Sequence, residues 1–124
     1  MQERRKAIRI NARLPVACTA ANLESHCWSW DISATGIGLM LNTRVEYGTI
    51  MELRIGLPDG QKPIYAEAKV FWQVENPQPA ENGQRDFRTG LMFTQLSPED
   101  RDRLIRFIAA FLRGQVPGVQ ENKA

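Results

Sequence analysis

Two short motifs, far apart in the sequence, carry the residues best suited to binding chemistry. Near the N-terminus, Arg5 and Arg9 form an R-x-x-x-R motif, and Arg4 stands directly before it. A guanidinium group can donate paired hydrogen bonds to phosphate oxygens, and also to O6 and N7 of guanine. The ammonium group of lysine lacks this planar fork. The first motif therefore favours an anionic ligand that also presents a base edge.

The second motif is D-x-S-x-x-G, formed by Asp31, Ser33 and Gly36. A carboxylate can accept hydrogen bonds from the N1–H and N2–H groups of guanine, which favours guanine over adenine. A serine hydroxyl can donate to a phosphate or accept from an amine. Glycine permits a turn with positive φ and lets a ligand approach the backbone. Together the two motifs suit a ligand that has both phosphates and purine edges.

Alternating apolar and polar residues predict that β-strands position these motifs, because this period of two is typical of a half-buried strand. The expected strands cover residues 13–20, 27–32, 37–41, 51–57, 64–74 and 87–93. Within the fifth strand, the alternation places Trp72 and Val74 on the same face as Val70. Trp28 and Trp30 alternate as core or interface residues would, and we assign them no ligand role.

The strand-like alternation ends before Ser97, which is followed by Pro98 and two acidic residues. A serine cap, a proline at the first helical position and acids in the first turn together predict the start of a helix. Apolar residues then recur at helical spacing, and Gly114 is a suitable C-cap. The expected apolar stripe consists of Leu104, Ile108, Phe111 and Leu112. Antiparallel strands need closing or covering, so we expect an all-β barrel with one amphipathic helix against an opening.

The length of 124 residues corresponds to a single domain. We predict a basic N-terminal arm over residues 1–11, a folded domain over residues 12–114 and a disordered tail over residues 115–124. The formal net charge is only +2, and the basic residues gather within the first thirteen positions. Such a local field suits a small anion and argues against binding of nucleic acid, which requires an extended basic surface.

Other functional classes leave no signal in the sequence. No apolar stretch approaches the roughly 20 residues of a membrane span, and the N-terminus does not resemble a secretory signal. We therefore expect a cytoplasmic protein without membrane insertion. Cys18 and Cys27 lack the spacing of metal ligands and are expected to be free thiols. His26 is the only histidine and has no catalytic partner nearby in the sequence, so we predict neither an enzyme, nor a cofactor, nor a metal site.

The two motifs, in this order within an all-β chain that ends in a helix, resemble those of the PilZ domain family of bacterial cyclic di-GMP receptors. The resemblance extends over about residues 3–112 and implies a six-stranded antiparallel barrel followed by a helix. It also implies that the motif residues bind cyclic di-GMP. These residues are Arg5, Arg9, Asp31, Ser33 and Gly36.

The resemblance carries three further expectations. Arg4 occupies a position that is associated with a stacked dimer of the ligand, and Trp72 matches a position where some members place an aromatic ring against it. The alternation of the strand leaves a core role for Trp72 equally open. The arm is expected to become ordered over the ligand and so to signal to an unidentified effector protein. The alternative is an adaptor that binds its protein partner constitutively, without nucleotide.

Overall fold

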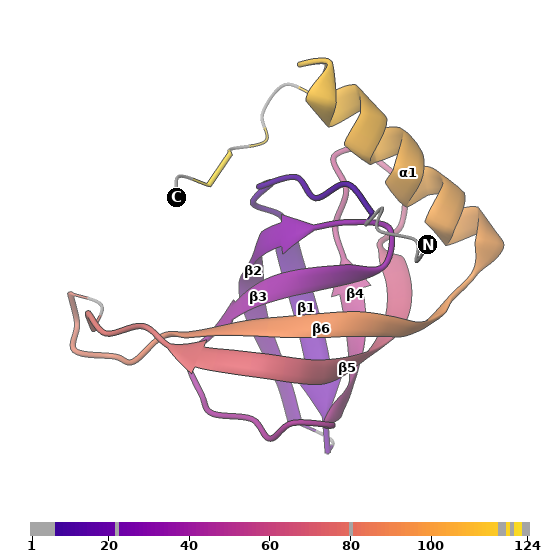
Figure 1. Cartoon of the computed structure of the whole chain (residues 1–124). Coiled ribbons are helices and arrows are strands. Elements are labelled where there is room, and N and C mark those ends of the chain that lie inside the picture. Colours follow the sequence, from indigo (N-terminus) through magenta and orange to yellow (C-terminus); the bar gives the residue numbers. More distant parts are fainter. Residues whose placement is uncertain (1–6, 22, 80, 117–118, 120, 123–124) are drawn as a thin grey trace, which may run out of the picture.

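The computed structural model describes residues 7–21, 23–79, 81–116, 119 and 121–122, with six strands and one helix (Figure 1). The elements are β1 (Pro15–Ala20), β2 (Leu23–Ile32), β3 (Gly36–Leu41), β4 (Ile50–Ile55), β5 (Ile64–Glu75), β6 (Phe87–Leu96) and α1 (Pro98–Leu112). Each strand expected from the sequence is present. Their bounds differ from those expected by a few residues, most of all at β2, which begins earlier.

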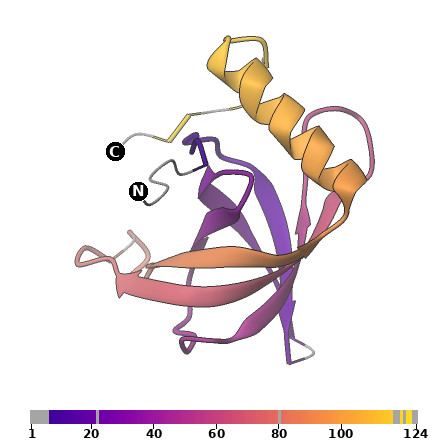
Figure 2. The same ribbon diagram turned by 45° about the vertical axis from the view of Figure 1, so that its right-hand side comes forward.

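The strands form a closed antiparallel barrel in the order β1-β2-β3-β6-β5-β4. Closure arises because β1 pairs with β2 on one side and with β4 on the other. This arrangement satisfies the backbone groups that an open sheet would leave at its edges. The helix α1 lies over one end of the barrel, as Figures 1 and 2 show. The expectation of a six-stranded barrel covered by a helix is confirmed.

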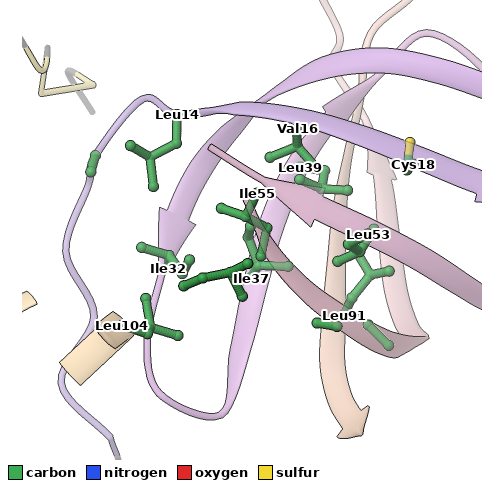
Figure 3. Close-up of a cluster of buried hydrophobic side chains, with 14 of the residues drawn as sticks. Leu14, Val16, Cys18, Ile32, Ile37, Leu39, Leu53, Ile55, Leu91 and Leu104 are labelled. Carbon is green, nitrogen blue, oxygen red and sulfur yellow. The ribbon is translucent and has the colours of Figure 1, made fainter. Parts of the chain in front are cut away.

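The core consists of the inward-facing residues of the strands together with one face of α1. Figure 3 shows labelled side chains from β1, β2, β3, β4, β6 and α1 converging inside the barrel. Fully buried members are Leu14, Val16, Ile32, Ile37, Leu39, Leu53, Ile55, Leu91 and Leu104. Leu104 comes from α1 and closes the covered end of the barrel. Burial of a leucine of this kind contributes about 2 kcal/mol to folding.

The helix begins as the sequence predicts. The Ser97 hydroxyl accepts a hydrogen bond from the backbone N–H of Asp100 at 3.1 Å, and Pro98 occupies the first helical position. Gly114 follows the last turn with φ of 71°. The predicted apolar stripe is correct for Leu104 and Ile108, which are buried, and Phe111 is partly buried against the core. It is wrong for Leu112, which is 57% exposed. Phe107 is also buried, because the face turned to the barrel follows the spacing of residues 104, 107, 108 and 111, and Leu112 lies beside that face.

A bulge in β5 overturns the expected orientation of its second half. The pairing with β6 shifts between Val70 and Trp72, so Phe71 is an extra residue in the strand. Beyond it, Gln73 turns inward and donates to the Thr89 hydroxyl at 2.9 Å. Trp72 and Val74 are 39% and 58% exposed. The prediction that these two share the inner face with Val70 is therefore wrong, since one inserted residue reverses every later side chain.

Another bulge lies in β2, between Ser29 and Asp31. Here the buried Ser29 faces inward, and its hydroxyl donates to the Ala12 carbonyl at 2.6 Å. Trp28 and Trp30 both lie on the outer surface, where an arginine stacks on each ring. A core role for these tryptophans is thus wrong, and an interface role stays a prediction.

Cys18 and Cys27 are free thiols, as expected. Their mutual hydrogen bond lowers the pKa of the Cys18 thiol to about 6. The same bond and burial raise the pKa of the Cys27 thiol. They form no part of the site described below.

Candidate functional site

The structure brings the two motifs together although they lie 22 residues apart. Arg9 donates from Nη1 to Oδ1 of Asp31 at 2.9 Å. The next residue, Ile10, anchors the arm because its backbone exchanges two hydrogen bonds of 3.0 Å with Ile32 at the end of β2. Arg4 and Arg5 lie outside the described residues. The expected proximity of the arm to the second motif is therefore visible for Arg9.

Ser33 shapes the turn between β2 and β3. Its buried hydroxyl oxygen accepts hydrogen bonds from the backbone N–H groups of Thr35 and Gly36, both at 3.2 Å. A serine that accepts from residues two and three positions ahead forms a compact local turn. In this structure the Ser33 hydroxyl thus stabilises the motif turn and places Asp31 just before it.

Gly36 serves a different purpose from the one expected. Its φ is not among the positive values of the chain, so the turn does not require the left-handed conformation here. A Cβ at this position would lie 2.5 Å from the carbonyl oxygen of Leu91 on β6. Glycine is needed because β3 and β6 approach closely at this point. The expectation of a positive φ is wrong, and the expected approach of a ligand to this backbone stays a prediction.

A row of four residues crosses the outer surface of the barrel next to the motif turn. Asp31 pairs with Gly38, Gly38 with Gly90, and Gly90 with Trp72, in the register of β2, β3, β6 and β5. We call this row the platform. A Cβ on Gly90 would overlap the indole of Trp72, so the ring lies directly above this glycine. A Cβ on Gly38 would crowd the carboxylate of Asp31.

The platform joins an acceptor at one end to a flat aromatic ring at the other. Its two glycines are buried, Gly90 beneath the indole and Gly38 beside the carboxylate, so a ligand would meet the ring and the carboxylate. A hollow of about 340 Å³, lined by residues 44–47 and by Val70, Trp72 and Gln73, adjoins its aromatic end. Sequence reasoning missed Gly38 and Gly90. The available signal was the presence of glycine within strand patterns, which often marks close approach of a backbone or a ligand.

The C-terminal part of the chain supports both motifs. Asn122 donates from its side chain to the carbonyls of Ser29 and Trp30, at 3.2 and 2.7 Å, beside the bulge of β2. Its backbone N–H donates to the carbonyl of Asn11 in the arm at 2.7 Å. The described residues of a segment that we expect to be disordered therefore contact the elements that carry Arg9 and Asp31.

The helix α1 and the strand β6 also hold the turn between β2 and β3 in place. Arg101, in the second turn of α1, donates to the carbonyl of Ala34 at 2.8 Å. On β6, the N–H of Phe93 donates to the carbonyl of Thr35 at 2.9 Å. The turn between β2 and β3 is thus held from two elements, which limits the positions that Asp31 can adopt.

Gly90→Ala is expected to displace the Trp72 indole, because a methyl group would occupy its place. The change should shift the indole N–H resonance of Trp72 in the NMR spectrum and destabilise the fold by about 1–3 kcal/mol, as overpacking does. Trp72→Phe identifies the resonance, and Trp28→Phe serves as the control that leaves it in place. An unchanged resonance in a stable Gly90→Ala protein would contradict the stacking of Trp72 on Gly90.

Within the described ranges, no helix combines the length and apolar character needed to span a bilayer. The same residues hold no group of three or more His, Cys, Asp or Glu side chains placed for a metal ion.

A closed six-stranded antiparallel barrel with a helix over one end, and an Arg–Asp pair beside the motif turn, defines a known class of domain. The sequence model of the PilZ domain matches residues 3–110. The chain therefore belongs to the PilZ domain family, and the resemblance inferred from the motifs is confirmed.

Solved structures show the same fold. The PilZ domain of YcgR from Escherichia coli, solved with cyclic di-GMP, is 19% identical, with a TM-score of 0.72 over 90% of this chain and 94% of that one. The Bacillus subtilis inhibitor of motility, MotI/DgrA, is 26% identical with a TM-score of 0.72. That match covers 90% of this chain but 53% of MotI, so the chain spans about half the length of that protein. Curated protein sequences provide no significant match.

Proposed function

We propose that this protein is a cyclic di-GMP receptor that passes its signal to a partner protein. The observation that carries the proposal is the ion pair between Arg9 and Asp31, which places both family motifs at one end of the platform. The YcgR PilZ domain, which shares this fold, was solved with cyclic di-GMP. A carboxylate, guanidinium groups and an indole are the groups that would recognise guanine edges, phosphates and base faces.

In the proposed complex, Asp31 accepts the N1–H and N2–H groups of one guanine. Asp31 uses Oδ1 in its bond to Arg9, and a carboxylate has about four acceptor sites in all. Arg9 uses one N–H in that bond and would direct others to a phosphate or to guanine O6 and N7. The second guanine, or a second ligand molecule, would lie against Trp72.

The arm is the proposed moving part. Ordering its backbone costs about 1–2 kcal/mol per residue, so contacts of Arg5 and Arg4 with the ligand would have to offset that cost. Arg4 is proposed to favour a stacked pair of ligand molecules. Ligand and closed arm would then stabilise each other, and the changed surface would be recognised by an effector in the cytoplasm.

Titration calorimetry with cyclic di-GMP tests the proposal, with GTP and cyclic di-AMP as controls. We expect selective binding of cyclic di-GMP, at two molecules per chain if Arg4 favours the stacked pair. Absence of binding by a protein whose circular dichroism shows a folded barrel would refute the receptor function.

One observation favours a constitutive adaptor as the second candidate. Arg9 pairs with Asp31, and Ser33 is buried within its own turn. The motif residues thus have structural roles within the chain itself. Binding of a partner protein with equal affinity in the presence and absence of cyclic di-GMP would support this candidate.

A further inference from the structure

Arg88 is a partly buried cation on the outer surface of β6. Its guanidinium carbon lies 4.1 Å from the ring centre of Trp30, so the two planar groups are in contact. Its Nε is buried and has no acceptor among the described residues. Six other arginines each pair with a carboxylate, namely Arg9, Arg44, Arg54, Arg85, Arg103 and Arg106. The Nε of Arg103 also lacks an acceptor, but Arg103 pairs with carboxylates, whereas Arg88 is a partly buried cation for which the described residues supply no carboxylate. Partial burial of such a cation costs free energy.

The position of Arg88 relative to the platform suggests the explanation. Thr89 is fully buried, so Arg88 and Gly90 on either side of it both face outward. Two residues along a strand correspond to roughly 7 Å. The cross-strand partner of Arg88 on β3 is Met40, and that of Gly90 is Gly38. Arg88 therefore stands in the row next to the platform, within reach of a dinucleotide lying on it.

The stacking on Trp30 also orients the guanidinium group. Trp30 is the residue directly before Asp31, and it belongs to the bulge that turns both side chains outward. A guanidinium held flat against a ring loses little rotamer entropy when it forms its next hydrogen bonds. The N–H edge of Arg88 is thus available to an acceptor on the same surface that Asp31 and Trp72 share.

We propose that Arg88 is a further ligand-binding residue that receives a phosphate group of the nucleotide on the platform. This inference rests on the proposed receptor function and extends it beyond the two sequence motifs. Arg88 binds a phosphate because an anion both supplies the missing acceptors and compensates the partly buried charge. It supplies a cation from the barrel wall in addition to the guanidinium group of Arg9.

The chain offers a matched control for this residue. Arg13 stacks on Trp28 with its guanidinium carbon 4.0 Å from the ring centre, which is nearly the same geometry. It precedes β1 and lies on the far side of β2 from Gly38 and Gly90. Arg88→Met and Arg13→Met each remove one positive charge and keep an unbranched side chain against a tryptophan. A difference in ligand affinity between the two variants would therefore reflect the position of the arginine and not the net charge of the protein.

Calorimetry with cyclic di-GMP on wild type, Arg88→Met, Arg88→Lys and Arg13→Met tests the inference. Hydrogen bonds to charged groups predict that Arg88→Met weakens binding by about 10-fold to 100-fold. Arg88→Lys should bind with an affinity between those of wild type and Arg88→Met, since it keeps the positive charge but loses the planar group that stacks on Trp30. Arg13→Met should stay within about twofold of wild type. The loss in Arg88→Met should also be smaller at high salt, because salt screens a contact between charges. Thermal unfolding of each variant shows whether the barrel is intact.

Four results would overturn the inference. The first is a folded Arg88→Met protein that binds within about twofold of wild type. The second is an equal loss in Arg13→Met, which would indicate a general effect of charge. The third is an Arg88→Lys protein as weak as Arg88→Met, and the fourth is a loss independent of salt, which would point to packing or to a neutral base edge. If wild type itself fails to bind, the proposed receptor function falls, and this inference with it.

Discussion

Asp31→Ala is expected to weaken the binding of cyclic di-GMP by about 100-fold or more while the barrel stays folded. In the proposed complex this carboxylate accepts two N–H groups of guanine, and each hydrogen bond to a charged group contributes about 1.5–3 kcal/mol. The same change removes the acceptor that holds Arg9 at 2.9 Å, so the arm loses its side-chain contact with β2. Asp31 is partly exposed, so its loss leaves the core untouched. Calorimetry gives the affinity, and circular dichroism verifies the fold.

Asp59→Ala is the matched control for that experiment. Asp59 pairs with Arg103 at 3.0 Å, on the loop between β4 and β5. It therefore shares the chemistry of the Arg9–Asp31 pair and lies away from the platform. Its replacement should leave the affinity within about twofold of wild type. An Asp31→Ala protein that also binds within about threefold of wild type would show that the carboxylate does not contact the ligand.

Gly36→Ala is expected to destabilise the protein by about 3 kcal/mol, since strained overpacking costs about 1–3 kcal/mol and more where the backbone must move. The added Cβ would lie 2.5 Å from the backbone oxygen of Leu91, which cannot rotate away as a side chain can. To relieve this clash, β3 would have to separate from β6, with which it pairs at six residue positions. Urea unfolding followed by tryptophan fluorescence measures the change in the free energy of unfolding.

Gly60→Ala provides the comparison. Gly60 has φ of 71°, and a Cβ there would meet nothing within 4 Å. Its replacement carries only the cost of a left-handed alanine, about 1–2 kcal/mol. Gly36→Ala should therefore be the more destabilised protein. If it unfolds at the same urea concentration as wild type, the close contact with β6 does not explain the motif glycine, and a role toward the ligand becomes the better account.

The elements of this protein were predictable because their signals are local. The cap at Ser97 and the buried Leu104 follow from residues a few positions apart, and both are as expected. The proximity of Arg9 to Asp31 was predictable for another reason, since the family motifs pair an arginine arm with an acidic turn. The same reasoning named Trp72 as a ligand contact, which stays a prediction, although its exposed position on the platform is compatible with it.

The outer surface was not predictable in the same way. The bulges at Trp30 and Phe71 add one residue to a strand, and nothing in the alternation of either strand marks them. Whether Trp72 faces the core or the solvent depends on the pairing of β5 with β6, which joins residues far apart in the chain. Asn122 is more than ninety residues away in the sequence from Ser29 and Trp30, and no local sequence pattern predicts its contacts with them.

The sequence by itself determined that this chain folds as an all-β barrel with a terminal helix, and that its motifs are those of the PilZ domain family. These properties follow from side-chain type and short-range periodicity, which act between neighbours along the chain. Only the tertiary structure decided that Gly38, Gly90 and Trp72 form a platform beside Asp31, that Gly36 serves close strand packing, and that Arg88 stands next to this surface without an acceptor among the described residues. Those arrangements depend on strand register and bulges, which are set by the packing of the whole barrel.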